Sequence, residues 1–154
     1  MSAPDFQKLL VESGLADKAV RVDDHLVRLQ WGSAFVIAGV SGSAIVAIAP
    51  LFSSLPAGKE QAFYRKLLEH NAHMGGMASF AIQPDGWVVL HSGRALKGLD
   101  GHELATMISA VGKFADQFDD ELIAEFFTGK QDSVPLDDDT IATEVSGAQL
   151  PQTD

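Results

Sequence analysis

The pattern of hydrophobic and polar positions predicts three β-strands in the first third of the chain. Residues 25–31 alternate, with Val27 and Leu29 on one face. Residues 34–40 and 44–49 are hydrophobic on both faces, and short Gly and Ser sequences separate the three segments. Such separators are typical of hairpin turns, so we expect an antiparallel meander. Because two of the strands are hydrophobic on both sides, the sheet needs a second covering layer in addition to its helices.

Three- and four-residue spacing of hydrophobic residues predicts helices over residues 2–15, 62–71 and 100–127. Gly14 is placed to end the first helix, and Asp100 can cap the third by accepting hydrogen bonds from its free amides. Packing on the sheet is the favoured interpretation of the first helix. A short terminal helix can also be exchanged between subunits or bind a partner.

A second hairpin is predicted between the last two helices. Residues 78–82 alternate, residues 83–86 (Gln-Pro-Asp-Gly) suit a tight turn, and residues 87–92 form the returning strand. Residues 50–57 are predicted as the connection into the central helix and residues 93–99 as a loop. The order helix, three strands, helix, two strands, helix predicts an α+β sandwich with an antiparallel sheet.

The composition divides the chain into two parts. With 154 residues there is room for one domain with a real core, which we assign to residues 1–128. Residues 129–154 are acidic, contain no aromatic residue and show no sustained periodicity. We therefore predict a flexible C-terminal tail there.

Charge and cysteine content exclude several classes of function. The net charge is −10 at pH 7 and the sequence pI is about 4.7, so we expect no nucleic-acid and no membrane partner, since both need a basic patch. The absence of cysteine excludes disulfides, thiolate zinc sites and cysteine catalysis. The N-terminus lacks the features of a signal peptide, and the longest hydrophobic region, residues 34–51, is interrupted by Gly, Ser and Pro. We therefore expect a cytoplasmic protein.

Few residues form a recognisable chemical site. His70 and His73 have a spacing that could hold a metal, but no second pair of ligands accompanies them, and a solvated helix end is favoured. Asp137–Asp139 lacks the spacing of a calcium loop. The sequence contains no Gly-x-Ser-x-Gly elbow and no phosphate loop. We therefore expect no enzyme activity, no metal and no cofactor.

Acidic residues crowd the C-terminal half of the third predicted helix, where they oppose the helix dipole. Two interpretations stay open, a basic partner and plain solubility, and solubility is slightly favoured. The residues concerned are Asp116, Asp119, Asp120, Glu121 and Glu125.

The order of the elements and several short motifs resemble the Tir chaperone (CesT) family of type III secretion. The central helix of that family typically carries Leu-Leu-x-x-Asn, which is present here as Leu67-Leu68-Glu69-His70-Asn71. Leu99-Asp100 matches the cap that opens its last helix. The resemblance covers residues 2–127. The related YbjN-type family shares the fold.

The resemblance implies a homodimer that holds an unfolded client segment in extended form, by strand addition and by filling pockets. It places the dimer interface at Phe63, Leu67, Phe80 and Trp87. It places the client-binding face at Val27, Leu29, Phe35 and Ile37. The alternative is a YbjN-like regulatory protein without a secretion client. An enzyme or small-ligand binder would need a polar pocket between sheet and helices, and the sequence offers no residues for one.

Overall fold

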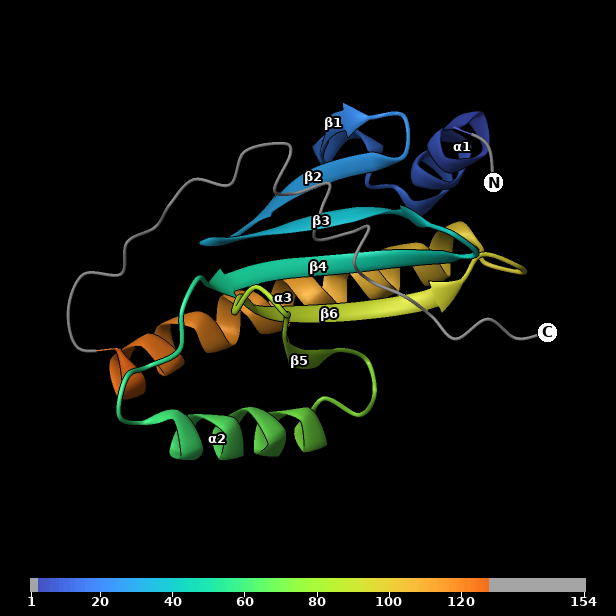
Figure 1. The fold of residues 1–154 in the computed structure, drawn as a ribbon. Coiled ribbons are helices and arrows are strands. Elements are labelled where there is room, and N and C mark those ends of the chain that lie inside the picture. Colours follow the sequence, from blue (N-terminus) through green and yellow to red (C-terminus); the bar gives the residue numbers. More distant parts are fainter. Residues whose placement is uncertain (1–2, 128–154) are drawn as a thin grey trace.

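A six-stranded antiparallel sheet is the central layer of the fold (Figure 1). The computed structural model describes residues 3–127. The strand order is β1-β2-β3-β4-β6-β5, so the last hairpin joins the sheet through β6 beside β4. The predicted α+β fold, the antiparallel meander and the second hairpin are confirmed. The strands are β1 (Ala19–Asp23), β2 (Leu26–Trp31), β3 (Ala34–Ser41), β4 (Ala44–Phe52), β5 (Ser79–Ile82) and β6 (Val88–Ala95).

The sheet has one strand more than the sequence pattern predicts. β1 is an edge strand whose residues are all exposed or half-buried, and it therefore lacks the hydrophobic alternation that identifies an inner strand. Two other strands are longer than predicted. β4 continues through Pro50, where the pairing with β6 shifts in register, and β6 continues to Ala95. A proline is tolerated there because an irregularity frees its nitrogen from the ladder.

Within residues 3–127, three α-helices accompany the sheet: α1 (Ala3–Ser13), α2 (Glu60–His73) and α3 (Gly101–Phe126). A short 3-10 helix, Ala16–Lys18, follows α1. Gly14 has a φ of 76° and ends α1, as predicted. The predicted cap of α3 is also confirmed, because the amide of Glu103 donates to the Asp100 carboxylate at 2.8 Å.

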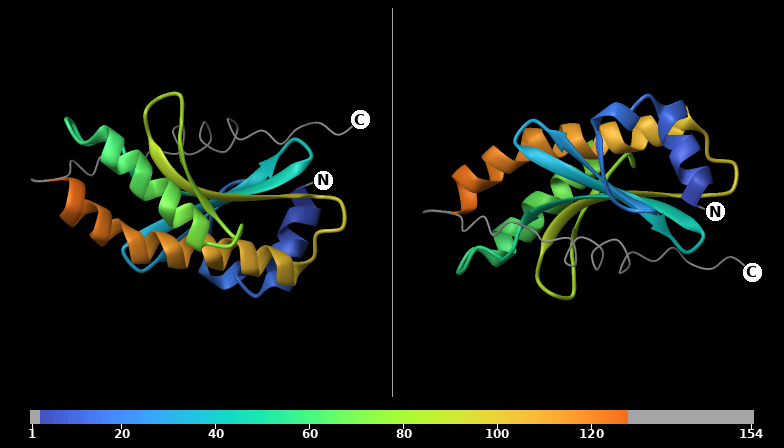
Figure 2. Two further views of the ribbon diagram at one scale, coloured as in Figure 1. Left: turned by 90° about the horizontal axis from the view of Figure 1, so that it is seen from below. Right: turned by 90° about the horizontal axis from the view of Figure 1, so that it is seen from above.

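The helices do not cover the two sides of the sheet equally. α3 crosses one face and packs against β2, β3, β4 and β6, and α1 packs on α3 (Figures 1 and 2). α2 lies beyond the β5 edge and contacts that strand. The main core therefore forms between α3 and alternate residues of the strands, among them Val36, Ala47 and Leu90, with Leu104 and Ile108 from the helix.

Two glycines let α3 approach its neighbours closely. A Cβ atom at Gly112 would overlap the indole ring of Trp31, and one at Gly101 would lie 2.5 Å from the backbone of Glu12. Both glycines have ordinary helical conformations, so they are needed here for space and not for backbone freedom. The contacts fix α3 against β2 at its middle and against α1 at its start.

Candidate functional site

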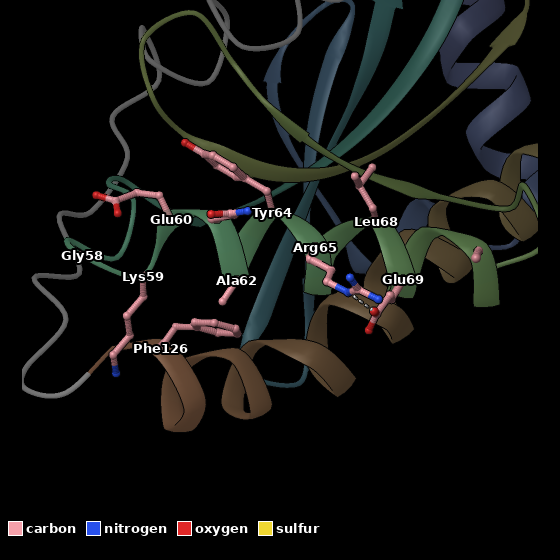
Figure 3. A pocket seen from close by; sticks show the side chains of 11 residues that line it. Gly58, Lys59, Glu60, Ala62, Tyr64, Arg65, Leu68, Glu69 and Phe126 are labelled. Carbon is pink, nitrogen blue, oxygen red and sulfur yellow. Dashed lines mark hydrogen bonds and ion pairs between the residues drawn. The ribbon is translucent and has the colours of Figure 1, made fainter.

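An open groove of about 1180 Å³ lies along the outward side of α2 (Figure 3). Tyr64 and Leu68, which are 38% and 67% exposed, supply its hydrophobic part. Charged side chains surround them, and Arg65 Nε donates to Glu69 Oε1 at 2.9 Å. A shallow surface with a hydrophobic centre and a charged rim suits contact with a protein better than enclosure of a small molecule.

The predicted dimer residues lie mainly beneath this groove. Phe63 and Leu67 form the inward stripe of α2, and Phe80 of β5 is also buried. Trp87 is half-buried in the turn before β6. In the single chain Phe63, Leu67 and Phe80 belong to the main core, so their role in a dimer stays a prediction. The hydrophobic side chains of α2 that another chain could touch directly are those of the groove.

Charge pairs and a stacked ring connect α2 to α3. Lys66 Nζ lies 3.4 Å from Glu121 and 3.5 Å from Glu125, and chiefly the charge of Glu125 raises the pKa of Lys66. His70 stacks on Phe118 with ring centroids 4.1 Å apart, and its Nε2 lies 3.4 Å from Glu121. These contacts orient α2 and therefore the groove on its outer side.

Two further acidic residues of α3 hold the turn between β2 and β3. The Ser33 amide donates to Asp116 Oδ1 at 2.9 Å, and its hydroxyl donates to Asp119 Oδ2 at 2.6 Å. The chain therefore supplies partners for four acidic residues of this helix, Asp116, Asp119, Glu121 and Glu125, in addition to any effect on solubility. Sequence reasoning missed this role because the partners are 51 to 86 positions away.

Asn71, the last residue of the Leu-Leu-x-x-Asn motif, binds the backbone of an edge strand. Its Oδ1 accepts from the Phe80 amide at 2.7 Å, and its Nδ2 donates to the Phe80 carbonyl at 3.4 Å. The side chain therefore pairs with β5 on the side away from β6, as a neighbouring strand would. Each named residue of the motif has a separate place in the structure: Leu67 packs in the core, Leu68 faces outward, and Asn71 bonds to the edge strand β5.

The face of the sheet opposite α1 and α3, which we call the outer face, is lined with hydrophobic side chains. They form two clusters made of strand residues and one turn residue, and no helix of the described part of the chain contributes to either cluster (Figure 1). The double-sided hydrophobic pattern of the strands was the signal for this surface. Its hydrophobic residues are Val22, Leu26, Phe35, Ile37, Ala44, Val46, Ile48, Ala81, Trp87 and Val89.

The four predicted client-binding residues do not share one face. Val27 and Leu29 point into the main core, whereas Phe35 and Ile37 lie on the outer face. The pairing of Leu29 with Val36 explains this division, because paired residues project to the same side of a sheet. Only Phe35 and Ile37 are therefore placed together, and their role in client binding stays a prediction.

Two basic side chains lie on the outer face among the hydrophobic ones. The Arg28 guanidinium sits 5.8 Å from the centroid of the Phe35 ring, within cation–π range. His91 is paired with Ile48 and is half-buried, and burial lowers its pKa. The outer face thus combines a hydrophobic floor with a small positive charge.

Residues 3–127 contain no group of three or more His, Cys, Asp or Glu side chains arranged to hold a metal ion. The same part of the chain has no helix that is both long and hydrophobic enough to cross a bilayer. The predictions for Asp137–Asp139 and for the tail from residue 129 lie outside the described residues.

The family model of the Tir chaperone protein (CesT) family matches residues 14–118. The matched region runs from the end of α1 to the middle of α3 and includes the whole sheet and α2. The comparison with curated proteins finds no significant match.

Similar folds occur in solved structures at low sequence identity. A chain of the heterodimeric ExoU–SpcU complex from the type III secretion system of Pseudomonas aeruginosa superposes with a TM-score of 0.56 and 16% identity, over 74% of this chain and 94% of that one. A chain of the ExsC–ExsE complex superposes with a TM-score of 0.57 and 14% identity, over 78% of this chain and 96% of that one. A third structure is that of the Yersinia pestis type III secretion chaperone SycH in complex with a stable fragment of YscM2. A chain of it superposes with a TM-score of 0.50 and 16% identity, over 75% of this chain and 97% of that one. The likeness establishes a shared fold.

Proposed function

The chain belongs to the Tir chaperone protein (CesT) family, and on that premise we propose that it is a binding protein that holds an extended hydrophobic segment of a client protein. The related folds come from complexes with other proteins, one of them a type III secretion chaperone with a bound fragment. The proposal includes a cytoplasmic site of action and a homodimer. It assigns the chain no catalytic role.

The outer face of the sheet is the observation that carries this proposal. It carries aliphatic side chains on three neighbouring inner strands: Ile37 of β3, Val46 and Ile48 of β4, and Val89 of β6. An extended segment laid on such a surface gains about 25 cal/mol for each Å² of hydrophobic area that it buries. Phe35 and Ile37, two of the predicted client-binding residues, lie within this surface.

The sheet edges differ in their suitability for strand addition. Asn71 occupies the backbone groups of Phe80 at the β5 edge. β1 is the edge strand at the opposite end, and its residues are exposed or half-buried. A client strand would therefore add at β1, where main-chain hydrogen bonds provide affinity without sequence specificity.

The groove on α2 is the surface that we propose for the homodimer. Tyr64 and Leu68 are hydrophobic and exposed there, and the charged residues around them can pair across a twofold axis. Phe63 and Leu67 would support this contact from inside the chain. The net charge of −10 would favour basic client segments and keep unbound protein in solution.

A capture experiment in the native organism tests the proposal. Tagged protein is recovered, its partners are identified by mass spectrometry, and the mass of the complex is measured by light scattering. We expect one dominant client, bound to a dimer through a hydrophobic segment, and a loss of that client in Phe35→Asp. Val11→Asp is the matched control, because Val11 is 67% exposed on α1, which packs on α3 at the opposite side of the sheet.

Other outcomes would contradict the proposal in distinct ways. A dimer that captures no client would favour the YbjN-like regulatory alternative. A monomer that carries a small molecule would place the protein in the class of ligand binders. Equal client capture by both Asp variants would show that the client binds elsewhere on the chain.

A further inference from the structure

β6 continues past the end of β5, its neighbour at the edge of the sheet (Figure 1). β5 pairs with β6 only as far as Ser79 and His91, whereas β4 pairs with β6 as far as Ala95. The segment before β5 does not continue the pairing, because the Met77 amide donates to the Met74 carbonyl at 3.1 Å in the turn after α2. Among residues 3–127, the end of β6 therefore has a partner strand on one side only.

The backbone groups of Gly93 and Ala95 point toward this unpaired side. In an antiparallel sheet, successive residues of a strand direct their N–H and C=O groups to opposite neighbours. The Leu96 amide donates to the Ser43 carbonyl at 2.9 Å, directly after the pair of β4 with Ala95. The even-numbered positions of β6 therefore bond to β4, and Gly93 and Ala95 face the other way.

The turn between β5 and β6 gives the same alternation independently. The Gln83 amide donates to the Trp87 carbonyl at 2.8 Å, so the odd-numbered positions of β6 are those that bond to β5. Gly93 is then the first of these positions whose place on the β5 side is vacant. In the described part of the chain, neither Gly93 nor Ala95 makes a main-chain hydrogen bond on that side.

The Arg94 side chain covers one of the vacant backbone groups. Its Nη1 donates to the Gly93 carbonyl at 2.8 Å and to Ser92 Oγ at 3.3 Å. No carboxylate of residues 3–127 lies within ion-pair distance of Arg94 or of Lys97. This edge therefore carries positive charge without an acidic partner, in a chain whose net charge is −10.

We propose that the edge at Gly93–Ala95 binds a short extended segment of a client as an added strand, and that this segment carries an acidic side chain between two hydrophobic ones. The proposal rests on the proposed function and adds a second place for strand addition besides β1. Gly93 and Ala95 pair with Val46 and Ala44 of the outer face. Client residues opposite Gly93 and Ala95 would lie on that face, where hydrophobic side chains can cover the space beside a glycine.

The client residue between these two would lie opposite Arg94, on the side of the main core, because Arg94 pairs with Ile45. Arg94 directs its backbone groups to β4, so its pair with the client would be of the type in which side chains approach most closely. The client amide would replace Arg94 Nη1 at the Gly93 carbonyl and so free the guanidinium. A carboxylate on the client would then be its partner across the two strands.

Amide NMR of the full-length protein with two synthetic peptides tests the proposal. The probe is acetyl-Ser-Thr-Val-Asp-Val-Thr-Ser-amide, and the comparison peptide has Lys in place of Asp. In the free protein, the amides of Gly93 and Ala95 should exchange rapidly with solvent. The amides of Ser92 and Arg94, which bond to β4, should exchange slowly and are the internal reference.

We expect the Asp peptide to shift the Gly93 and Ala95 amides saturably, to slow their exchange, and to bind about fivefold more tightly than the Lys peptide. Arg94→Glu should reverse this preference. Lys97→Glu is the matched control, because it makes the same change of charge at an exposed neighbouring position and should keep the preference. Arg94→Gln should abolish the preference, and it provides the test if the Glu variant does not fold.

Slow exchange of Gly93 and Ala95 in the free protein would overturn the proposal, and slowing that increases with protein concentration would identify a second copy as the occupant. Failure of both amides to shift with either peptide would also overturn it. Equal affinity of the wild type for the two peptides would overturn the assignment of an acidic client side chain.

These outcomes are separable from those of the proposed function. Peptide-induced shifts confined to β1 would overturn the site on β6 and leave the proposed function intact. Shifts at Gly93 and Ala95 in a protein that captures no client would support the site on β6 and remove the chaperone role.

Discussion

The backbone amide of Ser33 donates a hydrogen bond to the carboxylate of Asp116, 83 positions further along the chain. The Ser33 hydroxyl adds bonds to Asp116 and Asp119. Gly32 brings the turn close enough, because a Cβ there would overlap the Asp116 carboxylate. The β2–β3 turn is thus attached to the middle of α3, and the helix is held against the sheet at a point outside the hydrophobic core.

Asp116→Ala should lower the free energy of unfolding by about 1 kcal/mol, since it removes charge-assisted bonds that are partly exposed to water. Urea denaturation gives the value. Asp120→Ala is the control, because it removes the same charge from an exposed site on the same helix and should change stability by less than about 0.5 kcal/mol. Equal effects of the two variants would show that the turn contributes nothing.

Gly112→Ala should destabilise the protein although alanine is the better helix former. Propensity favours Ala by about 1 kcal/mol, but overpacking against the Trp31 ring costs about 1–3 kcal/mol, so we expect a net loss. Thermal and urea denaturation measure it. Combined with Trp31→Ala, the same substitution should become neutral or stabilising, because the ring that it meets is gone. Additive effects would contradict the contact.

Asn71→Ala should cost about 1–3 kcal/mol, because the amide and carbonyl of Phe80 lose their partner in a partly buried place. Asn71→Asp keeps the acceptor for the Phe80 amide, at 2.7 Å in the native chain, and should retain more stability than Asn71→Ala. Aggregation on standing, measured by light scattering, should follow the same order. If the Asn71→Ala variant is as stable as the wild type, the hydrogen bonds of Asn71 to β5 do not contribute to stability.

Because of His91, the free energy of unfolding should be smaller in mild acid than at neutral pH. Burial lowers its pKa in the folded state below the ordinary 6.5, so the unfolded chain binds the proton more readily. Its contribution is therefore fully present above pH 6.5 and decreases as the pH falls through 6.5 toward the folded-state pKa. His91→Gln should lose less stability than the wild type between pH 7.5 and 5.5, as followed by urea denaturation. The exposed His102→Gln is the control.

Leu68→Asp should convert the proposed dimer into a monomer, because a charge at the centre of a small hydrophobic contact is left without a partner. Light scattering measures the mass, and Val11→Asp is again the control. Leu68 is the sharper choice than Leu67, since Leu67 is 4% exposed and its replacement would test the core of the single chain. If the Leu68→Asp variant remains a dimer, the dimer interface does not lie at the groove.

Strand and helix periodicity could be read from the sequence wherever an element has a hydrophobic face. The alternation in β2 and the spacing in α3 are examples. β1 lacks such a face because it lies at the edge, and it was missed for that reason. Pro50 was expected to end its strand, but the change of register beside it accommodates the ring.

The candidate site was less predictable than the elements. The alternation of hydrophobic residues divides the side chains of one strand between its two faces, but it does not say which face of the next strand lies on the same side of the sheet. The two-residue turn at Gly32 and Ser33 implies that Trp31 pairs with Ala34, and hence Leu29 with Val36. Applied to the predicted client-binding residues, this register would have separated Leu29 from Ile37. Phe63 and Leu67 show a second limit of prediction from sequence. A hydrophobic stripe on a helix has the same pattern whether it packs in the core of one chain or in an interface between two chains.

The covered edge at Phe80 has a consequence for how copies of this chain could associate. Since Asn71 takes the amide and the carbonyl of Phe80, β1 of another copy could not pair with β5 at this residue, and head-to-tail stacking of sheets is disfavoured. Pairing between like edges, β1 with β1, closes on a twofold axis after two copies. One amide side chain thereby makes the open-ended addition of one copy's sheet to the next less favourable.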